Sequence, residues 1–268
     1  MQSLKTGLKI LNEISRAGGE LKVTEIANRL GIAKSQVSRM LATFREEGWV
    51  TQSPVTRGFS IGIAAYAAGS RFINSNRLTR EALPVMRGVV DRCGFTCTLS
   101  ILDGGTPLYL LGLDGPISAD FASRVGSYFP FHSTAPGKLL AAFAEEPVTS
   151  ALLRSEMTQF TSATITDAVS MRKTLRTARD CGVAVSRGER SAGIGAIAVP
   201  VFDGARNVAA LGIAYPLALV SESKVSDYTA LLHTRAAALS LRLGAESYPF
   251  QPQAQVRDDF VMHTMEKS

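Results

Sequence analysis

Polar and basic side chains gather between residues 34 and 39, where the spacing predicts the outer face of a helix. Arginine, glutamine and serine can hydrogen-bond to base edges in the major groove of DNA, and lysine and arginine can neutralise phosphates. We therefore interpret this stretch as a candidate DNA-reading surface. The predicted contacts are Lys34, Ser35, Gln36, Ser38 and Arg39, together with Thr24 earlier in the chain and Arg57 later.

Residues 24–41 would present this surface, because they read as two short helices joined by a glycine turn. Ala27 is small enough to let the helices approach closely, and Gly31 suits the positive φ of such a turn. Apolar residues recur at helical spacings and would bury one side of each helix. They are Ile26, Leu30, Ile32, Val37, Met40 and Leu41. The pattern predicts a helix-turn-helix; the alternative is an ordinary helical hairpin with a solvated polar face.

The flanking segments extend the helix-turn-helix to a winged helix. Residues 4–17 predict a first helix with an apolar stripe. Residues 48–52 and 58–61 read as two strands around a turn, and Arg57 in that turn would touch the DNA backbone or the minor groove. We expect residues 1–62 to form this DNA-binding domain.

Charge is divided unevenly along the chain. Residues 1–75 hold ten Lys and Arg against five Asp and Glu, whereas the rest of the chain holds nineteen against eighteen. A basic surplus on one domain is the electrostatic footprint of a nucleic-acid-binding module. No long apolar run is present, which argues against secretion and membrane spanning and predicts a cytoplasmic protein.

An alanine-rich helix is predicted over residues 61–73, apolar over much of its circumference. It is either buried against its own domain or in contact with a second copy of the chain, since contiguous apolar surface marks association. We favour contact with a second copy and expect a homodimer. The predicted boundaries are 63–76 for a linker helix, 77–245 for a second domain and 246–268 for a loosely ordered tail.

The second domain alternates helices with strands in an α+β pattern. Helices are predicted over residues 78–90, 133–143, 147–153, 171–181 and 222–243, and strands over 95–102, 108–113, 119–125, 183–186, 196–202 and 208–215. Short turns such as Asp203-Gly204 favour a largely antiparallel sheet flanked by helices. A domain of this class can hold a small molecule in a concave face.

Hydrolysis is one chemistry that this domain could be imagined to perform. Ser133 beside His132 would suggest the Ser-His pair of a hydrolase if an aspartate lay nearby in space. The candidate aspartates are Asp120, Asp167 and Asp203. Because neighbours along a strand point to opposite faces, His132 and Ser133 are not expected to meet.

Cysteine and histidine residues raise the questions of redox sensing and metal binding. Cys93 and Cys97 would share a face only if a helix carried both, and buried thiols are the competing interpretation. His233 and His263 are isolated from other ligand types, so neither a metal site nor a cofactor is predicted.

Several blocks of the chain resemble the IclR family of bacterial transcription regulators. In the second domain they are residues 131–141 (FHSTAPGKLLA), 182–185 (GVAV) and 193–203 (GIGAIAVPVFD), and in the first they are 21–41, 48–50 (GWV) and 59–62 (FSIG). The resemblance runs from Leu4 to Leu243. It implies a winged helix-turn-helix, a linker helix and a GAF-like α/β effector domain, assembled as dimers or dimers of dimers on pseudo-palindromic operator DNA.

The resemblance also implies where a small-molecule effector binds. The implied residues are Phe121, Phe129, Thr134, Ala135, Pro136, Gly137, Ser186, Ile194, Ala196, Gly212 and Ala214. The helix beginning near Thr134 would offer backbone N–H groups and the positive end of its dipole, which suit a carboxylate. The competing interpretation is that this helix start serves only as a cap.

This chain departs from family members that bind small polar acids. Where such members commonly carry an Asp, a Cys and two Ser, this chain has Ser186, Ala196, Gly212 and Ala214. Pro136 also removes a backbone donor, because proline has no N–H. A roomier, more apolar pocket is expected, with Thr98, Ser100 or Thr134 as further polar candidates. We predict a ligand-responsive transcription regulator, not an enzyme, whose effector is a carboxylic acid with an apolar or aromatic body.

Overall fold

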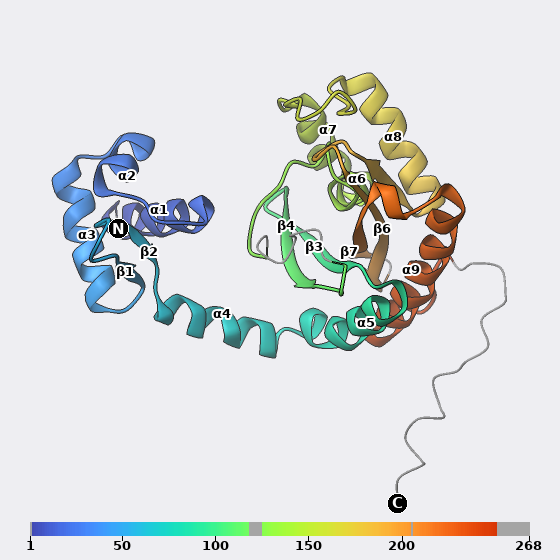
Figure 1. Cartoon of the computed structure of the whole chain (residues 1–268), viewed down its shortest axis with the longest axis horizontal. Helices are drawn as coiled ribbons and strands as arrows, with labels where there is room; N and C mark the ends of the chain where they lie inside the picture. The colour runs from blue at the N-terminus through green and yellow to red at the C-terminus, as the bar shows by residue number, and fades with distance from the viewer. Residues whose placement is uncertain (1, 118–124, 205, 251–268) are drawn as a thin grey trace, which may run out of the picture. The chain divides into compact units, whose positions relative to one another are not determined.

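The helix-turn-helix is present in the computed structural model, which describes residues 2–117, 125–204 and 206–250 (Figure 1). Helix α1 spans Gln2–Ala17, α2 spans Val23–Leu30 and α3 spans Lys34–Glu46. Gly31 ends α2 at φ 64°, a left-handed conformation that glycine adopts without a Cβ clash. The core of this unit consists of the buried residues Ile10, Ile14, Leu21, Ile26, Ala27, Val37, Leu41, Val50 and Phe59.

A two-stranded wing follows α3. Strand β1 (Val50–Gln52) pairs antiparallel with β2 (Phe59–Ile61). Arg57, in the turn between them, has φ 60°, which is uncommon for a residue with a side chain. The Gln52 side-chain amide donates to the Arg57 carbonyl oxygen at 3.1 Å and supports that conformation. The predicted winged helix is therefore confirmed.

Helix α4 (Ile63–Ser75) presents large apolar side chains to solvent. None of its residues is buried, and Ile63 and Tyr66 are 75% and 70% exposed. Its own domain therefore does not bury this helix, and its apolar side chains remain exposed. Helix α5 (Arg77–Cys93) follows, and the chain divides into two compact units between Arg80 and Glu81.

The second unit is built on one antiparallel sheet. Its strands are β3 (Thr96–Asp103), β4 (Thr106–Leu113), β5 (Ala184–Arg187), β6 (Ile194–Asp203) and β7 (Arg206–Pro216), in the order β4-β3-β7-β6-β5. Helix α6 (Ala135–Phe143) packs on one face of the sheet and carries α7 (Glu146–Arg154) and α8 (Ala168–Cys181). Helix α9 (Glu222–Leu243) covers the other face, after a short 3-10 helix at Leu217–Leu219 (Figure 1). The predicted α+β class is confirmed.

Small residues cover the sheet face against which α6 packs. Ala196 and Ala198 on β6 lie opposite Ala214 and Gly212 on β7. A Cβ at Gly212 would stand 2.6 Å from the Ile197 carbonyl oxygen, closer than van der Waals contact allows. Close packing therefore requires glycine at 212, and the expectation that this position supplies free volume for a ligand is wrong.

The chain up to residue 250 is packed, so the tail predicted for 246–268 does not begin at 246. Tyr248 is 4% exposed, and its hydroxyl donates to the Pro200 carbonyl oxygen at 3.1 Å and lies 2.9 Å from His233 Nδ1. Phe250 stacks near Phe202. Single aromatic residues bury apolar surface without any periodicity, so a periodic pattern cannot reveal them. Residues 251–268 lie outside the described residues, as does the strand predicted at 119–125 except for Val125, which is in a turn.

Candidate functional site

The predicted DNA-contacting side chains lie on α2, α3 and the wing. Val37 and Leu41 of α3 turn into the core and Met40 packs against it, so that the polar residues of the helix face outward. Thr24, Lys34, Ser35, Ser38, Arg39 and Arg57 are exposed, and Gln36 is half-buried.

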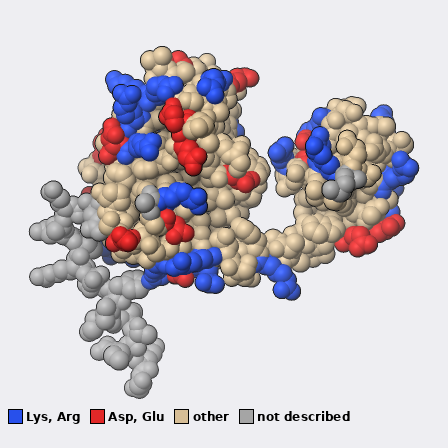
Figure 2. Space-filling view, turned by 180° about the vertical axis from the view of Figure 1, so that it is seen from behind, with Lys and Arg blue, Asp and Glu red and all other residues tan. Residues whose placement is uncertain are grey.

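The first turn of α3 adds backbone donors to this surface. Ala33 provides no side-chain cap, and its carbonyl oxygen accepts from the amides of Gln36 and Val37. The amides of Lys34 and Ser35 remain at the positive end of the helix dipole, where phosphate groups bind. Figure 2 shows Lys and Arg side chains spread over the visible face of this unit, in keeping with its excess of basic residues.

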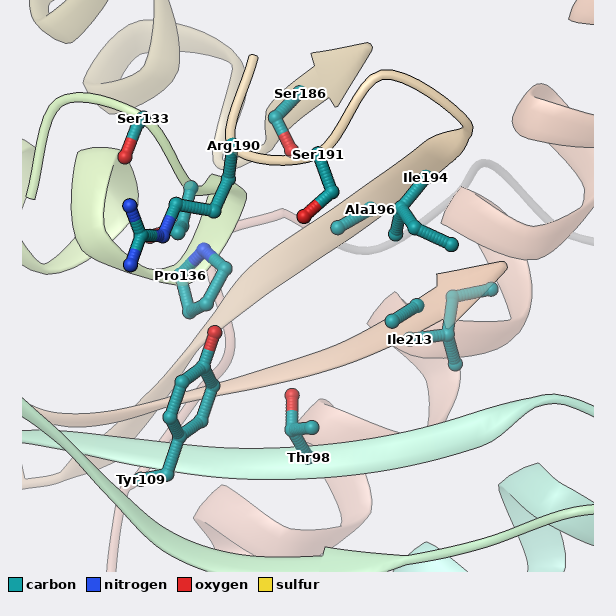
Figure 3. Close-up of a pocket in the computed structure, with 12 residues that line it drawn as sticks. Thr98, Tyr109, Ser133, Pro136, Ser186, Arg190, Ser191, Ile194, Ala196 and Ile213 are labelled. Atoms are coloured by element: carbon teal, nitrogen blue, oxygen red, sulfur yellow. The ribbon is translucent and has the colours of Figure 1, made fainter. Parts of the chain in front are cut away.

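A pocket in the second unit opens between the start of α6, the loop after β5 and the sheet (Figure 3). Its lining residues are Thr98, Tyr109, Ser133, Thr134, Pro136, Ser186, Arg190, Ser191, Ile194, Ala196, Ile213 and Ala214. Figure 3 shows Arg190 and Ser133 at one end of the pocket and Ile194 and Ala196 at the other.

This pocket combines a mostly apolar wall with polar groups that the sequence did not locate. Hydroxyl groups line it from Thr98, Tyr109, Ser133, Thr134, Ser186 and Ser191, and Arg190 adds a guanidinium. These hydroxyl groups come mostly from elements outside positions 186, 196, 212 and 214, whereas Pro136, Ile194, Ala196, Ile213 and Ala214 keep the apolar wall that was expected. A ligand here would meet both hydrogen-bonding and apolar walls.

Thr134 caps α6 at the pocket wall. Its hydroxyl accepts from the Gly137 amide at 3.1 Å, and its carbonyl oxygen accepts from the Lys138 amide at 3.0 Å. Since Pro136 has no amide proton, Ala135 is the remaining donor of the first turn. A carboxylate at this helix end would find fewer backbone donors than predicted and would depend on side chains.

A loop at 188–193 carries Arg190 into the pocket. The hydroxyls of Thr161 and Thr164 donate to two carbonyl oxygens of this loop, at 2.8 and 2.7 Å. The guanidinium carbon of Arg190 lies 3.8 Å from the centroid of the Phe160 ring, within cation–π distance. The segment before α8 therefore supports the loop and orients its arginine.

Six of the predicted effector residues line this pocket: Thr134, Pro136, Ser186, Ile194, Ala196 and Ala214. Phe129 stacks on Tyr109, with ring centroids 4.0 Å apart, and thus lies behind that wall. Ala135, Gly137 and Gly212 are absent from the lining, and Phe121 lies outside the described residues. A Cβ at Gly137 would stand 2.6 Å from the Phe131 carbonyl oxygen, so this glycine also serves packing.

Sequence reasoning missed Tyr109, Arg190, Ser191 and Ile213. Arg190 and Ser191 lie in the loop before strand β6, and a charged side chain between Gly188 and Gly193, next to a predicted pocket strand, was the available signal. Tyr109 offered no local signal, because only the pairing of β4 with β3 brings it near the pocket.

The geometry does not support hydrolysis at Ser133. His132 Nε2 lies 2.9 Å from the Thr158 carbonyl oxygen and is thereby turned to that neighbour. Ser133 Oγ is buried and has no hydrogen-bond partner among the described residues. Asp167 caps α8. A serine hydroxyl without an adjacent base is not an activated nucleophile.

Cys93 and Cys97 are buried and belong to a helix and a strand. Both are free cysteines, and burial raises the pKa of both thiols, that of Cys97 well above its ordinary value. Redox-sensing cysteines are accessible and have a lowered pKa, so the geometry does not support redox sensing.

The described residues contain no group of three or more His, Cys, Asp or Glu side chains that could hold a metal ion. Within the same ranges, no helix is long and apolar enough to cross a membrane.

Two family models match the chain. The one described as the C-terminal part of the bacterial transcriptional regulator IclR matches residues 70–241, and the one for the IclR helix-turn-helix domain matches residues 3–54. The HTH-type transcriptional regulator XynR of Escherichia coli (strain K12) is 30% identical over 246 residues, which cover 91% of this chain and 98% of that protein.

Solved structures share the same fold. The crystal structure of an IclR transcriptional regulator from Alicyclobacillus acidocaldarius matches with a TM-score of 0.81 and 29% identity, covering 91% of this chain and 99% of that one. An IclR homolog from Microbacterium hydrocarbonoxydans, complexed with 4-hydroxybenzoate, matches with a TM-score of 0.77 and 23% identity, covering 90% and 98%. From these matches and the two domains described above, the chain belongs to the IclR family of bacterial transcriptional regulators.

Proposed function

We propose that this ligand-responsive regulator reads operator DNA with α3 and contacts the DNA backbone with its wing. The observation that supports this is the exposed row of Lys34, Ser35, Ser38 and Arg39 beside the uncapped first turn of α3. Side chains on such a helix reach base edges, whereas a wing arginine mainly neutralises phosphate. Thr24, Gln36 and Arg57 complete the proposed contact set.

Substitutions in these two places should have different effects. Arg39→Ala and Gln36→Ala should relax sequence preference, since one bidentate base contact is worth about 1–3 kcal/mol of discrimination. Arg57→Ala should weaken all DNA similarly. Arg29→Ala is the matched control, because that guanidinium pairs with Glu13 at 3.0 Å. Binding is measured at fixed salt on operator and scrambled DNA, and unchanged discrimination by Arg39→Ala would contradict the assignment.

We also propose a homodimer, or a dimer of dimers, in which α4 contacts its symmetry mate. The support is the exposed apolar surface around Ile63 and Tyr66. A two-fold dimer presents one helix-turn-helix to each half of a pseudo-palindrome. Light scattering should show at least a dimer at micromolar concentration, and Tyr66→Glu should shift it toward monomer. A wild-type monomer with a footprint on one half-site would refute this proposal.

We propose further that the effector is a small carboxylic acid with an apolar or aromatic body. The observation that carries this is the placement of Arg190 and Ser133 at one end of the pocket and of Ile194 and Ala196 at the other (Figure 3). Arginine binds carboxylates through paired N–H donors, and burial of apolar surface contributes about 25 cal/mol per Å². A two- or three-carbon keto acid has little such surface. The complex of the Microbacterium homolog with 4-hydroxybenzoate is compatible with this class of ligand.

Calorimetric titration with glyoxylate, pyruvate and substituted benzoates tests this proposal. Benzoates should bind more tightly than the keto acids, and the opposite order would exclude an aromatic effector. Arg190→Gln should weaken benzoate but leave the binding of benzamide, which carries no charge, nearly unchanged. Arg187→Gln is the control, because Arg187 is an exposed neighbour whose guanidinium pairs with Glu222 at 2.7 Å outside the pocket.

A further inference from the structure

A buried ion pair joins two walls of the effector pocket. Lys138 Nζ lies 2.7 Å from Glu189 Oε1 and 2.9 Å from Oε2, and it also donates to the Val185 carbonyl oxygen at 2.8 Å. The Lys138 side chain is 2% exposed and that of Glu189 11%. The ammonium group has three donors, and these contacts use all of them.

The two ends of this pair belong to different pocket elements. Lys138 lies on α6, one turn after Thr134, which lines the pocket. Glu189 directly precedes Arg190 and Ser191, which line it from the opposite loop. The ion pair therefore ties the helix wall to the loop that carries the arginine.

Stability alone is a poor explanation for a buried pair of this kind. Taking both charges out of water costs about as much as their attraction returns, so apolar residues of similar volume are often as stable. Burial lowers the pKa of the Lys138 ammonium, and the neighbouring Glu189 carboxylate opposes that effect. What the pair contributes is a tether, because the Lys138 ammonium holds the Glu189 carboxylate and the Val185 carbonyl oxygen at hydrogen-bond distance at the same time.

The Lys138–Glu189 ion pair also affects the charge of the pocket lining. Glu189 neutralises Lys138, and neither residue is part of the lining. Among the described lining residues, Arg190 is the charged one. An anionic ligand in the pocket would therefore meet the Arg190 guanidinium, whose loop is anchored one residue away.

We propose that Lys138 and Glu189 are positioning residues for effector binding: they hold the 188–191 segment so that Arg190 is aligned with the carboxylate of the ligand. This inference rests on the proposed effector site. It extends that proposal, since neither residue touches the ligand and both act through Arg190.

The test uses the full-length double variant Lys138→Met/Glu189→Met, which removes both charges and leaves none unpaired. The control is Arg187→Met/Glu222→Met, which removes an exposed ion pair from the adjacent end of β5. Chemical denaturation should show the double variant folded. Hydrogen exchange, measured by mass spectrometry without ligand, should be at least tenfold faster at 188–191 in the double variant and unchanged there in the control.

Benzoate is the ligand probe, and benzamide is its uncharged counterpart. The double variant should bind benzoate at least tenfold more weakly and lose the preference for benzoate over benzamide. A merely structural role would weaken both probes equally and would overturn the proposal, as would unchanged exchange at 188–191. If the wild-type protein binds no benzoate, the effector chemistry proposed above is wrong, and hydrogen exchange alone decides the positioning role.

A second variant covers the case in which the double variant does not fold. Glu189→Asp keeps the charge but shortens the side chain by one methylene, so Lys138 retains a partner. It should fold and show a smaller rise in exchange, confined to the same loop. Exchange equal to that of the wild-type protein would contradict the proposal.

Discussion

Replacing Ser133 with alanine is expected to stabilise the effector domain and to weaken ligand binding. Ser133 is 0% exposed, and its Oγ has no hydrogen-bond partner among the described residues, although it lines the pocket. A buried hydroxyl without a partner costs stability, because it gave up its contacts with water on folding. Because Ser133 lines the pocket, we expect a bound ligand to hydrogen-bond to the same hydroxyl. Stability and binding should therefore change in opposite directions.

The gain in stability follows from the hydrogen bond that Ser133 lacks in the folded protein, and the loss of affinity follows from the hydrogen bond that it would make to the ligand. An unsatisfied buried donor or acceptor costs about 1–3 kcal/mol, so the alanine variant should gain about 1–2 kcal/mol after allowing for partial relaxation. For a domain of this size, each kcal/mol raises Tm by about 2–4 °C. A hydrogen bond to a charged carboxylate contributes about 1.5–3 kcal/mol, so its loss should weaken binding roughly ten- to hundredfold.

Ser100 provides a matched control for the stability effect. It is also 0% exposed, and its Oγ also has no hydrogen-bond partner among the described residues. It lies on β3 but is absent from the pocket lining. Ser100→Ala should therefore raise Tm by a similar amount and leave ligand affinity unchanged.

The assay is a thermal melt and a calorimetric titration of each variant with the tightest-binding benzoate. A fall in Tm for Ser133→Ala would show that the hydroxyl is satisfied in solution, and the argument from burial would fail. Unchanged affinity would remove Ser133 from the site. Weaker binding by Ser100→Ala would show that the pocket extends further along β3 than its lining indicates.

Three further predictions concern other parts of the chain. Burial lowers the pKa of His233 from 6.5 to about 4, so its contribution is fully present above pH 6.5 and is lost as the pH falls toward 4. The loss should be at most about 3 kcal/mol, and urea unfolding between pH 7 and 4.5 should show a shallower decline in His233→Gln. Arg57→Gly should unfold at a higher temperature than Arg57→Ala, by about 1 kcal/mol in stability, because only glycine adopts φ 60° without strain; both should bind DNA equally weakly. Gly212→Ala should destabilise the effector domain by about 1–3 kcal/mol in chemical denaturation, because its Cβ would meet the Ile197 carbonyl oxygen.

Local patterns in the sequence were sufficient to predict the helices and strands. The closing helix Glu222–Leu243 has the predicted bounds, and the strands of the sheet lie within two residues of theirs. Backbone hydrogen bonds in helices and turns join residues that are close in the chain, so periodicity and turn residues are enough to locate them. The same patterns predicted the outward face of α3.

The site depended more on tertiary structure than its motifs suggested. Resemblance to a family placed the start of α6 and strands β6 and β7 at the pocket. It could not show that Gly212 serves strand packing, or that Arg190 enters from the loop before β6. Both facts depend on contacts between segments far apart in the chain. The burial of Tyr248 also depends on distant segments, because its hydroxyl contacts the His233 ring and the Pro200 carbonyl oxygen.

Ser100 and Ser133 show most clearly that the sequence alone does not predict the surroundings of a side chain. In the sequence Ser100 lies between two apolar residues and Ser133 between His132 and Thr134, yet both are fully buried in the structure. Only the packing of α6 on the sheet places one hydroxyl at the pocket wall and leaves the other inside the domain. The chain's local preferences determine which elements form, but the surroundings of a side chain are determined by how those elements pack, because its neighbours come from other parts of the chain.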